Sequence, residues 1–459
     1  MEETEGTKKV HNEETKKRSL RYLRSFVVNL LRSLRPLRRI GGTLNAVSRS
    51  LPGLLVLCCL FIANSSSLPA QEWPQFRGPG GQGHSSERGL PTEWSESKNV
   101  AWKVAVPGRG WSSPVVADGR VWLTTATQLG RDSSLRLLSF DAATGRQSVD
   151  VEVFRLKGSA LLNPKNSHAS PTPLVEGDRV YVHFGADGTA ALSTSGEVVW
   201  KARELYESQH GNGGSPILYG DLLIFSCDGF NEAFVIALDK RTGKTRWRTD
   251  RPQPWSQAYS TPLVIRVADR DQLVSVSAFH TVAYDPQNGK EIWRVNYPDG
   301  FSNVPRPVSG AGMVFITTGF QQPSIMAIRP DGKGDVTKTH VAWTLSRGAP
   351  LTPSPVLVGD DLYVVTDAGI ASSIDVRTGA IQWQHRLGEG MSASPVFADG
   401  RIYFLDEEGR TTVITPGKSF QQISLNVLDG PALASMAVAS QSFFIRTATH
   451  LYRIASVIQ

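Results

Sequence analysis

The segment ALDKRTGKTRW (237–247) decides the fold, because close variants of it recur along the chain. The best copies are AYDPQNGKEIW (283–293) and SIDVRTGAIQW (373–383), each with its tryptophan eight residues after the aspartate. SFDAATGRQSV (139–149) keeps the aspartate, threonine and glycine but has Val149 in place of the tryptophan. The Asp and Thr side chains can accept backbone N–H bonds and the glycine can adopt a left-handed conformation, so each copy predicts a tight turn.

Ahead of each copy stands a small polar residue with a proline, and then two short apolar runs around a second turn. PVLVGDDLYVVT (355–366) and PVFADGRIYFLD (395–406) show this order, and Gly-Asp or Asp-Gly between apolar runs is a hairpin signal. The openings lie at Ser113-Pro114, Thr172-Pro173, Ser215-Pro216, Thr261-Pro262, Arg306-Pro307, Ser354-Pro355 and Ser394-Pro395, with a degenerate eighth near Ala434-Ser435.

A repeat of roughly 40–50 residues made only of short strands and turns is typical of a β-propeller. The fold class is therefore all-β, an eight-bladed propeller of four-stranded antiparallel blades. The last repeat (434–454) has inner strands but no following tryptophan, whereas Trp102 in NVAWKV (99–104) has no inner strands before it. We expect these two halves to form one blade, so that the N-terminal strand closes the ring.

The recurrent tryptophan falls on the predicted fourth strand, where a flat ring can wedge between neighbouring blades. Phe420 approximates this structural role in the seventh repeat. Six tryptophans are expected to have it: Trp102, Trp200, Trp247, Trp293, Trp343 and Trp383.

The net charge of +7 belongs to the N-terminus. Residues 1–50 hold 12 of the 49 Lys and Arg but only 5 of the 42 Asp and Glu, which leaves 37 residues of each sign in the remainder. A net-neutral remainder argues against nucleic-acid binding.

The apolar run LLVLCCLFIA (54–63) is too short to span a bilayer and is followed by polar residues and Ala70, which is typical of a secretory signal. We expect cleavage after Ala70 and export to the periplasm, cell envelope or exterior. The domains would then be a leader and signal peptide (1–70), a lead-in segment (71–98) and the propeller (99–459). The basic stretch 20–40 is an extended signal n-region, or the result of a start codon assigned too early, or an amphipathic helix on a membrane. Lipid attachment at Cys58 or Cys59 is an alternative to simple cleavage, and membrane contact is expected only through the leader.

The Asp-x-x-Thr-Gly-x-x-x-Trp repeats resemble the tryptophan-docking repeats of the pyrroloquinoline-quinone (PQQ)-like propeller superfamily, which includes quinoprotein alcohol dehydrogenases and outer-membrane assembly lipoproteins of the BamB type. WPQFRGP (73–79), LPTEWS (90–95), GRGWSSPVV (108–116) and QHGNGGSPILYGDLLIFSCDG (209–229) resemble a secreted subgroup of these proteins. The resemblance covers residues 71–459 and implies the fold, but the superfamily contains both enzymes and binding scaffolds.

For a quinoprotein dehydrogenase, the resemblance implies PQQ above a tryptophan floor, a disulfide of adjacent cysteines, and Ca²⁺ held by Glu, Asn and Asp. The only adjacent cysteines are Cys58 and Cys59 in the leader, so the mature chain retains Cys227 alone and cannot form that disulfide. No calcium-binding set falls on a family motif, and no G-x-S-x-G, C-x-x-C, H-E-x-x-H or P-loop motif is present. We therefore expect no catalytic residues, no metal and no cofactor.

Residues just before each opening proline should surround the mouth of the axial funnel. The candidate ligand-binding residues there are polar or aromatic: Trp111, His168, His210, Asn212, Tyr259 and Arg306. A polar channel that merely satisfies strand ends would show the same residues. The sequence favours an exported, monomeric, non-catalytic scaffold that holds a protein or polar small molecule at its funnel face. The alternative is a PQQ-dependent dehydrogenase acting on alcohols or sugars.

Overall fold

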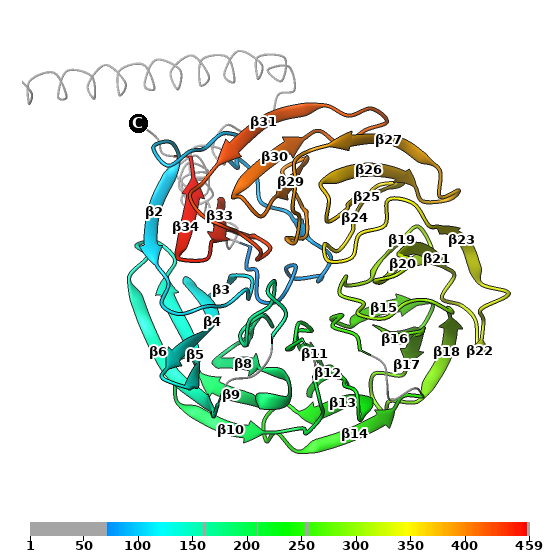
Figure 1. The fold of residues 1–459 in the computed structure, drawn as a ribbon, viewed down its shortest axis with the longest axis horizontal. Coiled ribbons are helices and arrows are strands. Elements are labelled where there is room, and N and C mark those ends of the chain that lie inside the picture. Colours follow the sequence, from blue (N-terminus) through cyan, green and yellow to red (C-terminus); the bar gives the residue numbers. More distant parts are fainter. Residues whose placement is uncertain (1–70, 159–161, 209, 253–256, 457–459) are drawn as a thin grey trace, which may run out of the picture. The chain divides into compact units, whose positions relative to one another are not determined.

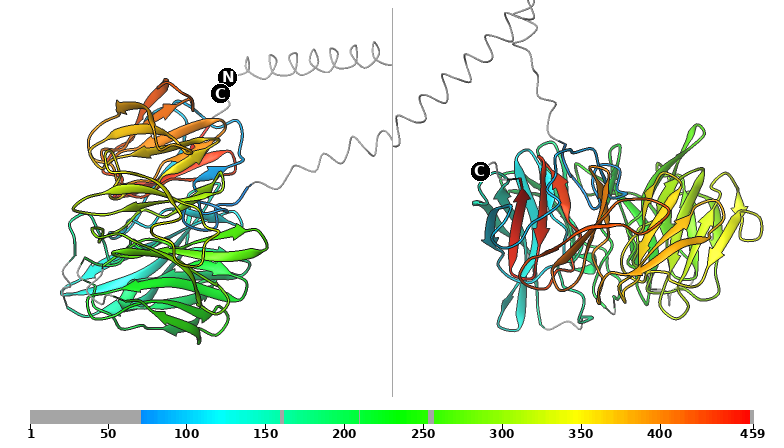
Figure 2. Two further views of the ribbon diagram at one scale, coloured as in Figure 1. Left: turned by 90° about the vertical axis from the view of Figure 1, so that its right-hand side faces the viewer. Right: turned by 90° about the horizontal axis from the view of Figure 1, so that it is seen from above.

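The computed structural model describes residues 71–158, 162–208, 210–252 and 257–456. The predicted signal peptide, Cys58, Cys59 and the basic stretch 20–40 lie outside these residues. The described part consists of eight sheets arranged around one axis, shown down that axis in Figure 1 and from the side in Figure 2. The predicted eight-bladed, four-stranded antiparallel propeller is confirmed. Within these ranges no helix is long and apolar enough to cross a membrane.

Each blade runs from an innermost strand of three to five residues to an outermost strand at the rim. Blades 1 to 3 are formed by β3 (Val115–Ala117), β4 (Arg120–Leu129), β5 (Asp132–Asp141) and β6 (Gln147–Leu156); β7 (Leu174–Glu176), β8 (Arg179–His183), β9 (Thr189–Ser193) and β10 (Val198–Ala202); and β11 (Ile217–Tyr219), β12 (Leu222–Asp228), β13 (Ala233–Asp239) and β14 (Thr245–Asp250). A single 3₁₀ turn, η2 (Gly185–Asp187), joins β8 to β9.

Blades 4 to 6 repeat this order. They are formed by β15 (Leu263–Val267), β16 (Arg270–Val276), β17 (His280–Tyr284) and β18 (Glu291–Asn296); β19 (Val308–Gly310), β20 (Met313–Thr318), β21 (Ser324–Ile328) and β23 (Val341–Leu345); and β24 (Val356–Val358), β25 (Asp361–Val365), β26 (Ile370–Asp375) and β27 (Ile381–Arg386). The short β22 (Gly334–Asp335) adds a parallel edge to blade 4.

Blades 7 and 8 bring the two ends of the domain together. They are formed by β28 (Val396–Ala398), β29 (Arg401–Leu405), β30 (Arg410–Ile414) and β31 (Gln422–Val427), with the short parallel β1 (His84–Ser85) beside β28; and by β32 (Ala437–Ala439), β33 (Ser442–Arg446), β34 (His450–Ala455) and β2 (Val100–Ala105). β2 pairs with β34 in an antiparallel ladder that sets Lys103 opposite Tyr452. The predicted closure of the ring by the N-terminal strand is confirmed.

Tight turns shape the inner hairpins. Asp118 and Gly119 join β3 to β4 with φ of 48° and 69°, and Asp399 and Gly400 join β28 to β29 with φ of 48° and 74°. Two consecutive positive φ values give a turn whose twist matches that of paired strands, and Asp-Gly tolerates both. The Asp-Gly pairs seen in the sequence thus build the hairpins next to the axis.

The rim tryptophans join one blade to the next. Trp247 on β14 donates from Nε1 to the Pro286 carbonyl at 3.1 Å, and its ring lies against Gly289 in the turn of blade 4. Gly289 has φ of 71°, and a Cβ there would approach the Trp247 ring to 2.6 Å. The same bond joins four other tryptophans to a carbonyl of the next blade, the pairs being Trp102–Ala142, Trp200–Lys240, Trp343–Val376 and Trp383–Gly417.

Trp293 makes its contact through an intermediary. Its Nε1 donates to Gln272 Oε1 at 2.7 Å, and Gln272 Nε2 donates to the Pro330 carbonyl of blade 5 at 3.0 Å. Phe420 does not occupy the equivalent position in blade 7. It precedes β31 and stacks on His385 of blade 6, while Ser424 stands opposite Val413 where the tryptophan would be.

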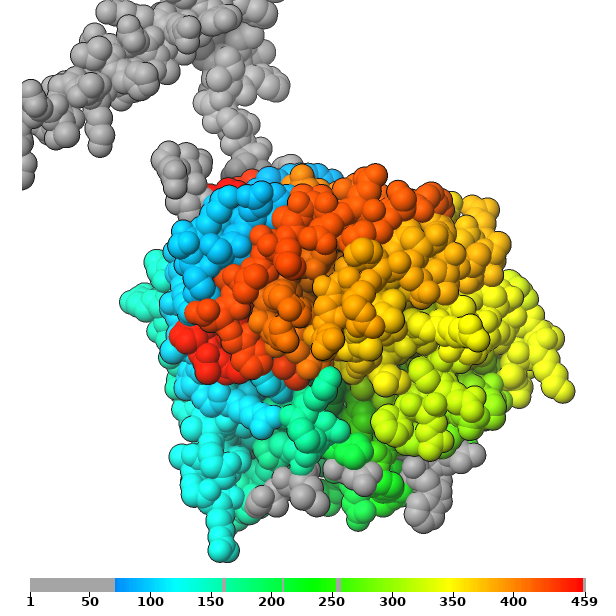
Figure 3. All heavy atoms as spheres, turned by 45° about the horizontal axis from the view of Figure 1, so that its top comes forward, coloured from blue at the N-terminus to red at the C-terminus, as the bar shows by residue number. Residues whose placement is uncertain are grey.

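The first half of the lead-in segment (71–98) crosses the ring near its axis, and its second half runs along the outer strand β31. Trp73 bridges to Val116 of blade 1, the Pro74 carbonyl accepts from Val175 N of blade 2, and the Gly83 carbonyl accepts from Phe397 N of blade 7. Figure 1 shows this blue segment running across the middle of the ring, and Figure 3 shows blue atoms against the red last blade and orange blade 7. The lead-in therefore ties distant blades together.

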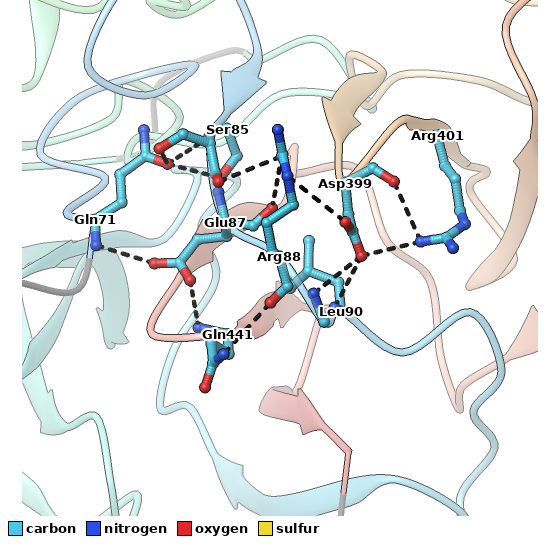
Figure 4. A network of polar contacts seen from close by, with 10 residues as sticks. Gln71, Ser85, Glu87, Arg88, Leu90, Asp399, Arg401 and Gln441 are labelled. Carbon is cyan, nitrogen blue, oxygen red and sulfur yellow. Dashed lines mark hydrogen bonds and ion pairs between the residues drawn. The ribbon is translucent and has the colours of Figure 1, made fainter. Parts of the chain in front are cut away.

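A polar network fixes the middle of the lead-in to blades 7 and 8 (Figure 4). The Glu87 carboxylate accepts from Ser440 N at 3.0 Å and from Gln441 N at 2.9 Å in the turn between β32 and β33. Asp399 Oδ2 accepts from Gly89 N and Leu90 N in the same way. Because both carboxylates accept from backbone N–H groups, these contacts fix the path of the main chain.

Candidate functional site

An axial cavity of about 580 Å³ opens where the inner strands begin. Its wall is largely aromatic and apolar, with Trp111, Tyr259, Phe301 and Phe320 among its residues. Phe76 of the lead-in also lines it, so the crossing segment contributes to the far end of the bowl. A concave, mostly apolar site with a few convergent polar groups is the usual form of a ligand pocket.

A ring of hydroxyl groups surrounds the axis inside this cavity. In seven of the eight blades the residue two positions before the inner strand is Ser or Thr, it is buried, and it lines the cavity: Ser113, Thr172, Ser215, Thr261, Ser354, Ser394 and Ser435. We call these seven residues the hydroxyl ring. These Ser and Thr residues are visible in the sequence at the blade openings. There they were used only to mark where each repeat begins, and not as candidate binding residues.

Backbone N–H groups link the ring from one blade to the next. Ser113 N donates to Thr172 Oγ1 at 3.0 Å, Thr172 N to Ser215 Oγ at 2.9 Å, and Ser215 N to Thr261 Oγ1 at 2.9 Å. On the other side Arg306 N, Ser354 N and Ser394 N donate at 2.9 Å to Ser354, Ser394 and Ser435 respectively. The hydroxyl oxygens therefore hold neighbouring blades in register, and every acceptor in this series lies on the next blade.

Arg306 stands at the eighth position of the ring but does not line the cavity. Its guanidinium is buried and donates to the Phe76 carbonyl at 2.7 Å and the Pro262 carbonyl at 3.1 Å. Gly81 of the lead-in packs against it so closely that a Cβ would approach Nη1 to 2.4 Å. Burial lowers the pKa of Arg306 to about 9. The structure thus places this candidate in the joint between blade 5 and the lead-in.

Three of the predicted candidates, Trp111, His210 and Tyr259, do meet in the cavity. The His210 and Tyr259 rings lie 6.3 Å apart, and Tyr259 Oη donates to Gln257 Oε1 at 3.0 Å. Burial raises the pKa of Tyr259, so the phenol remains protonated and can donate. The Nε1 of Trp111 is buried and has no hydrogen-bond partner among the described residues.

His168 and Asn212 lie elsewhere. His168 lines a separate cavity of about 430 Å³ with Arg109 and Gln128, and burial lowers its pKa although Asp187 lies 4.0 Å away. Asn212 donates weakly to the Gly214 carbonyl at 3.4 Å and packs on Gly185.

The charged groups of the bowl are held by protein partners. Lys165 Nζ lies 2.7 Å from Glu407 Oε1, which also accepts from Ser392 Oγ at 2.6 Å. Asp367, the only carboxylate that lines the cavity in the described chain, accepts from Leu351 N at 2.7 Å and Thr352 N at 3.2 Å.

These residues do not fit the quinone and calcium set that the resemblance implies. The described part of the chain has no group of three or more His, Cys, Asp or Glu placed to hold a metal, and its one cysteine, Cys227, is buried in β12. The one lining carboxylate already accepts two backbone N–H bonds. No step through PQQ or Ca²⁺ follows from this arrangement.

Comparison with known proteins agrees with the fold. A family model described as "Outer membrane protein assembly factor BamB" matches residues 84–223, 136–250, 231–421 and 335–449. The chain belongs to this family. Two BamB proteins are similar in sequence: that of Burkholderia pseudomallei (strain K96243), 27% identical over 70% of this chain and 79% of its own length, and that of Yersinia pestis, 22% identical over 66% and 74%.

A BamB crystal structure from Moraxella catarrhalis shares the propeller. It covers 78% of this chain and 98% of its own, with a TM-score of 0.56 and 11% identity. At that identity the likeness supports the fold alone.

Proposed function

We propose that this protein is an exported, non-catalytic scaffold that holds a protein or polar ligand in the axial bowl. The observation that carries the proposal is the bowl itself: about 580 Å³, with aromatic walls, a ring of hydroxyls and three of the predicted binding residues. Phe320 at this site is 61% exposed and its ring centroid lies 5.8 Å from that of Phe301, so the two rings offer an apolar contact surface at the bowl.

Two further observations support binding over catalysis. The two carboxylates at the bowl, Asp367 and Glu407, both serve as acceptors for protein groups, and Lys165 is paired. Two proteins similar in sequence carry the name "Outer membrane protein assembly factor BamB". We therefore propose that this chain also binds a protein partner in the cell envelope. The leader would be removed by cleavage after Ala70.

Site-specific photo-crosslinking tests the proposal. A benzophenone side chain at Phe320 should give a discrete adduct in cells, whereas one at Leu425, 52% exposed on the rim strand β31, should give none. Adducts from Leu425 alone would place the binding surface on the rim and overturn the proposal. N-terminal sequencing of the same purified protein should begin near Gln71.

The dehydrogenase alternative has its own test. Purified protein incubated with PQQ and Ca²⁺ should retain no quinone absorbance through gel filtration and should reduce no dye with alcohols or sugars. Stoichiometric retention or turnover would replace the scaffold proposal with the enzyme.

A further inference from the structure

The hydroxyl ring has unused donors. A serine or threonine hydroxyl has one O–H donor and two acceptor lone pairs. Six of the seven ring oxygens accept a backbone N–H from the blade before, so one lone pair of each is engaged. None of the seven O–H groups has an acceptor among the described residues, and all seven residues line the cavity. The ring therefore presents hydrogen-bond donors to whatever enters the bowl.

Charges of both signs lie at or near the bowl. Asp367 lines it and accepts two backbone N–H bonds, and Lys165 is paired with Glu407. Arg306 and Arg77 are both buried at the lead-in joint, where Arg77 donates to the Ser354, Pro355 and Gln82 carbonyls. Neither forms an ion pair with a carboxylate in the described part of the chain, so their charge is compensated only by carbonyl dipoles. Interactions with buried charge are screened much less than those at the surface. Both arginines contact the ring at Ser354, so two buried cations without a carboxylate partner lie beside the ring donors.

The cavity is large enough to hold more than a single anionic group. A carboxylate alone fills a small part of about 580 Å³, and the remaining wall offers the faces of Trp111, Tyr259 and Phe301. A peptide segment can place a carboxylate among the hydroxyls while its backbone and neighbouring side chains cover these rings.

We propose that the axial bowl recognises a carboxylate, presented by an acidic side chain on a protruding segment of a partner protein. This inference rests on the proposed scaffold function and names the chemistry of its site. Hydrogen bonds to a charged acceptor are stronger than those to a neutral one, so an aspartate should be preferred over an asparagine of the same shape.

The test uses short peptides and the mature chain. Acetyl-Gly-Asp-Gly-amide should bind in calorimetric titration about tenfold more tightly than acetyl-Gly-Asn-Gly-amide. Acetate separates the two sources of the group: weaker binding than the Asp peptide supports a peptide-borne carboxylate, and equal binding indicates a free small anion. Equal affinity for the Asp and Asn peptides, or binding of neither at millimolar concentration, would overturn the inference.

Matched variants locate the binding. Thr261→Val removes a ring hydroxyl and leaves Ser215 N without its acceptor, and it should weaken binding of the Asp peptide about tenfold. Thr447→Val removes a buried hydroxyl that accepts from His450 N outside the cavity, and it should leave that affinity unchanged. Near-UV circular dichroism checks that both variants fold, and Thr172→Val provides a second ring position. Loss of binding in Thr447→Val as well would mean that the ring is not the site.

The outcomes separate this inference from the broader proposal. If crosslinking from Phe320 succeeds but the protein binds the Asp and Asn peptides equally, the scaffold proposal is supported and the inference of carboxylate recognition is wrong. If the Asp peptide binds at the ring but Phe320 gives no adduct in cells, the site is real and the partner-protein proposal is wrong.

Discussion

The seam between blades 3 and 4 and the seam between blades 7 and 8 are filled by tryptophans from different sources. At the first, Trp247 of the repeat itself bonds to Pro286 and lies on Gly289. At the second, Ser424 stands in the repeat position, and Trp94 of the lead-in fills the space between Tyr403 of blade 7 and Phe443 of blade 8. Trp94 N donates to Asn426 Oδ1 at 2.8 Å, which fixes the lead-in on β31.

The position of the chain ends explains the difference. Blade 8 takes its outer strand β2 from the N-terminal end of the domain, so no turn connects its third and fourth strands. In four other seams (8–1, 2–3, 3–4 and 5–6) that turn supplies both the carbonyl and the glycine on which a tryptophan docks. A repeat tryptophan on β31 would therefore have no such turn to meet, and the lead-in supplies an indole from outside the repeat. The lead-in is thus part of the folded domain.

Removing the lead-in gives the largest expected effect. A chain that begins at Asn99 keeps β2 but loses Trp94, the Arg77 bonds and the Glu87 network. Because the seam between blades 7 and 8 would lose its buried indole and expose apolar blade faces, we expect it to lose the single cooperative melting transition of the chain that begins at Gln71. Calorimetry measures this, and an unchanged transition would show that the repeats alone close the ring.

Replacing either of the two tryptophans by alanine should have the next largest effect on stability. Trp94→Ala and Trp247→Ala should each lower the free energy of unfolding by about 3–5 kcal/mol, the usual cost of deleting a large buried aromatic side chain. Hydrogen exchange should accelerate in β32–β34 for Trp94→Ala and in β15–β18 for Trp247→Ala. A small loss at Trp94 alone would mean that the closing seam depends on strand pairing and not on the indole.

The sequence predicted the blades, the closing strand and the rim tryptophans because each leaves a local pattern of turn residues and apolar runs. It did not predict the role of Trp94 or Phe76, since the lead-in has no periodicity and the partners of these two residues lie more than 200 positions away. Phe420 was assigned as an approximate match, but it lies before β31, and Ser424 stands opposite Val413 as Trp247 stands opposite Ala237. Arg306 was taken as a funnel residue because its backbone position is right, but its side chain turns to the lead-in.

Replacing each tryptophan by phenylalanine measures what the indole N–H contributes to stability at the two seams. Trp247→Phe removes the Nε1 bond and leaves the Pro286 carbonyl without that donor, whereas Trp94 Nε1 is buried without a partner among the described residues. The loss in stability should be about 1 kcal/mol larger at Trp247 than at Trp94. Urea denaturation of both variants measures the difference, and equal losses would show that the indole bond adds nothing to the repeat seam.

Acid should weaken the closing seam slightly through Glu96 of the lead-in. Its carboxylate accepts from Asp429 N at 2.8 Å and Tyr452 Oη at 2.9 Å and lies 2.8 Å from Lys103 Nζ. Burial alone would raise the pKa of Glu96, but these bonds outweigh it and hold the pKa below its ordinary value of 4.5. Since the folded pKa is the lower one, this stabilisation is complete above pH 4.5 and is lost as the pH falls through the folded pKa.

Glu96→Gln measures that contribution. Because the pair is about one-third exposed, we expect a loss of only a few tenths of a kcal/mol at pH 7, and no loss once the pH is below the folded pKa. Glu93→Gln is the matched control, since Glu93 pairs with Lys98 in full contact with solvent and should change nothing measurable at either pH. Urea denaturation at the two pH values gives the comparison. A penalty for Glu96→Gln that is the same at both would show that the shape of the side chain, and not its charge, holds the lead-in to blade 8.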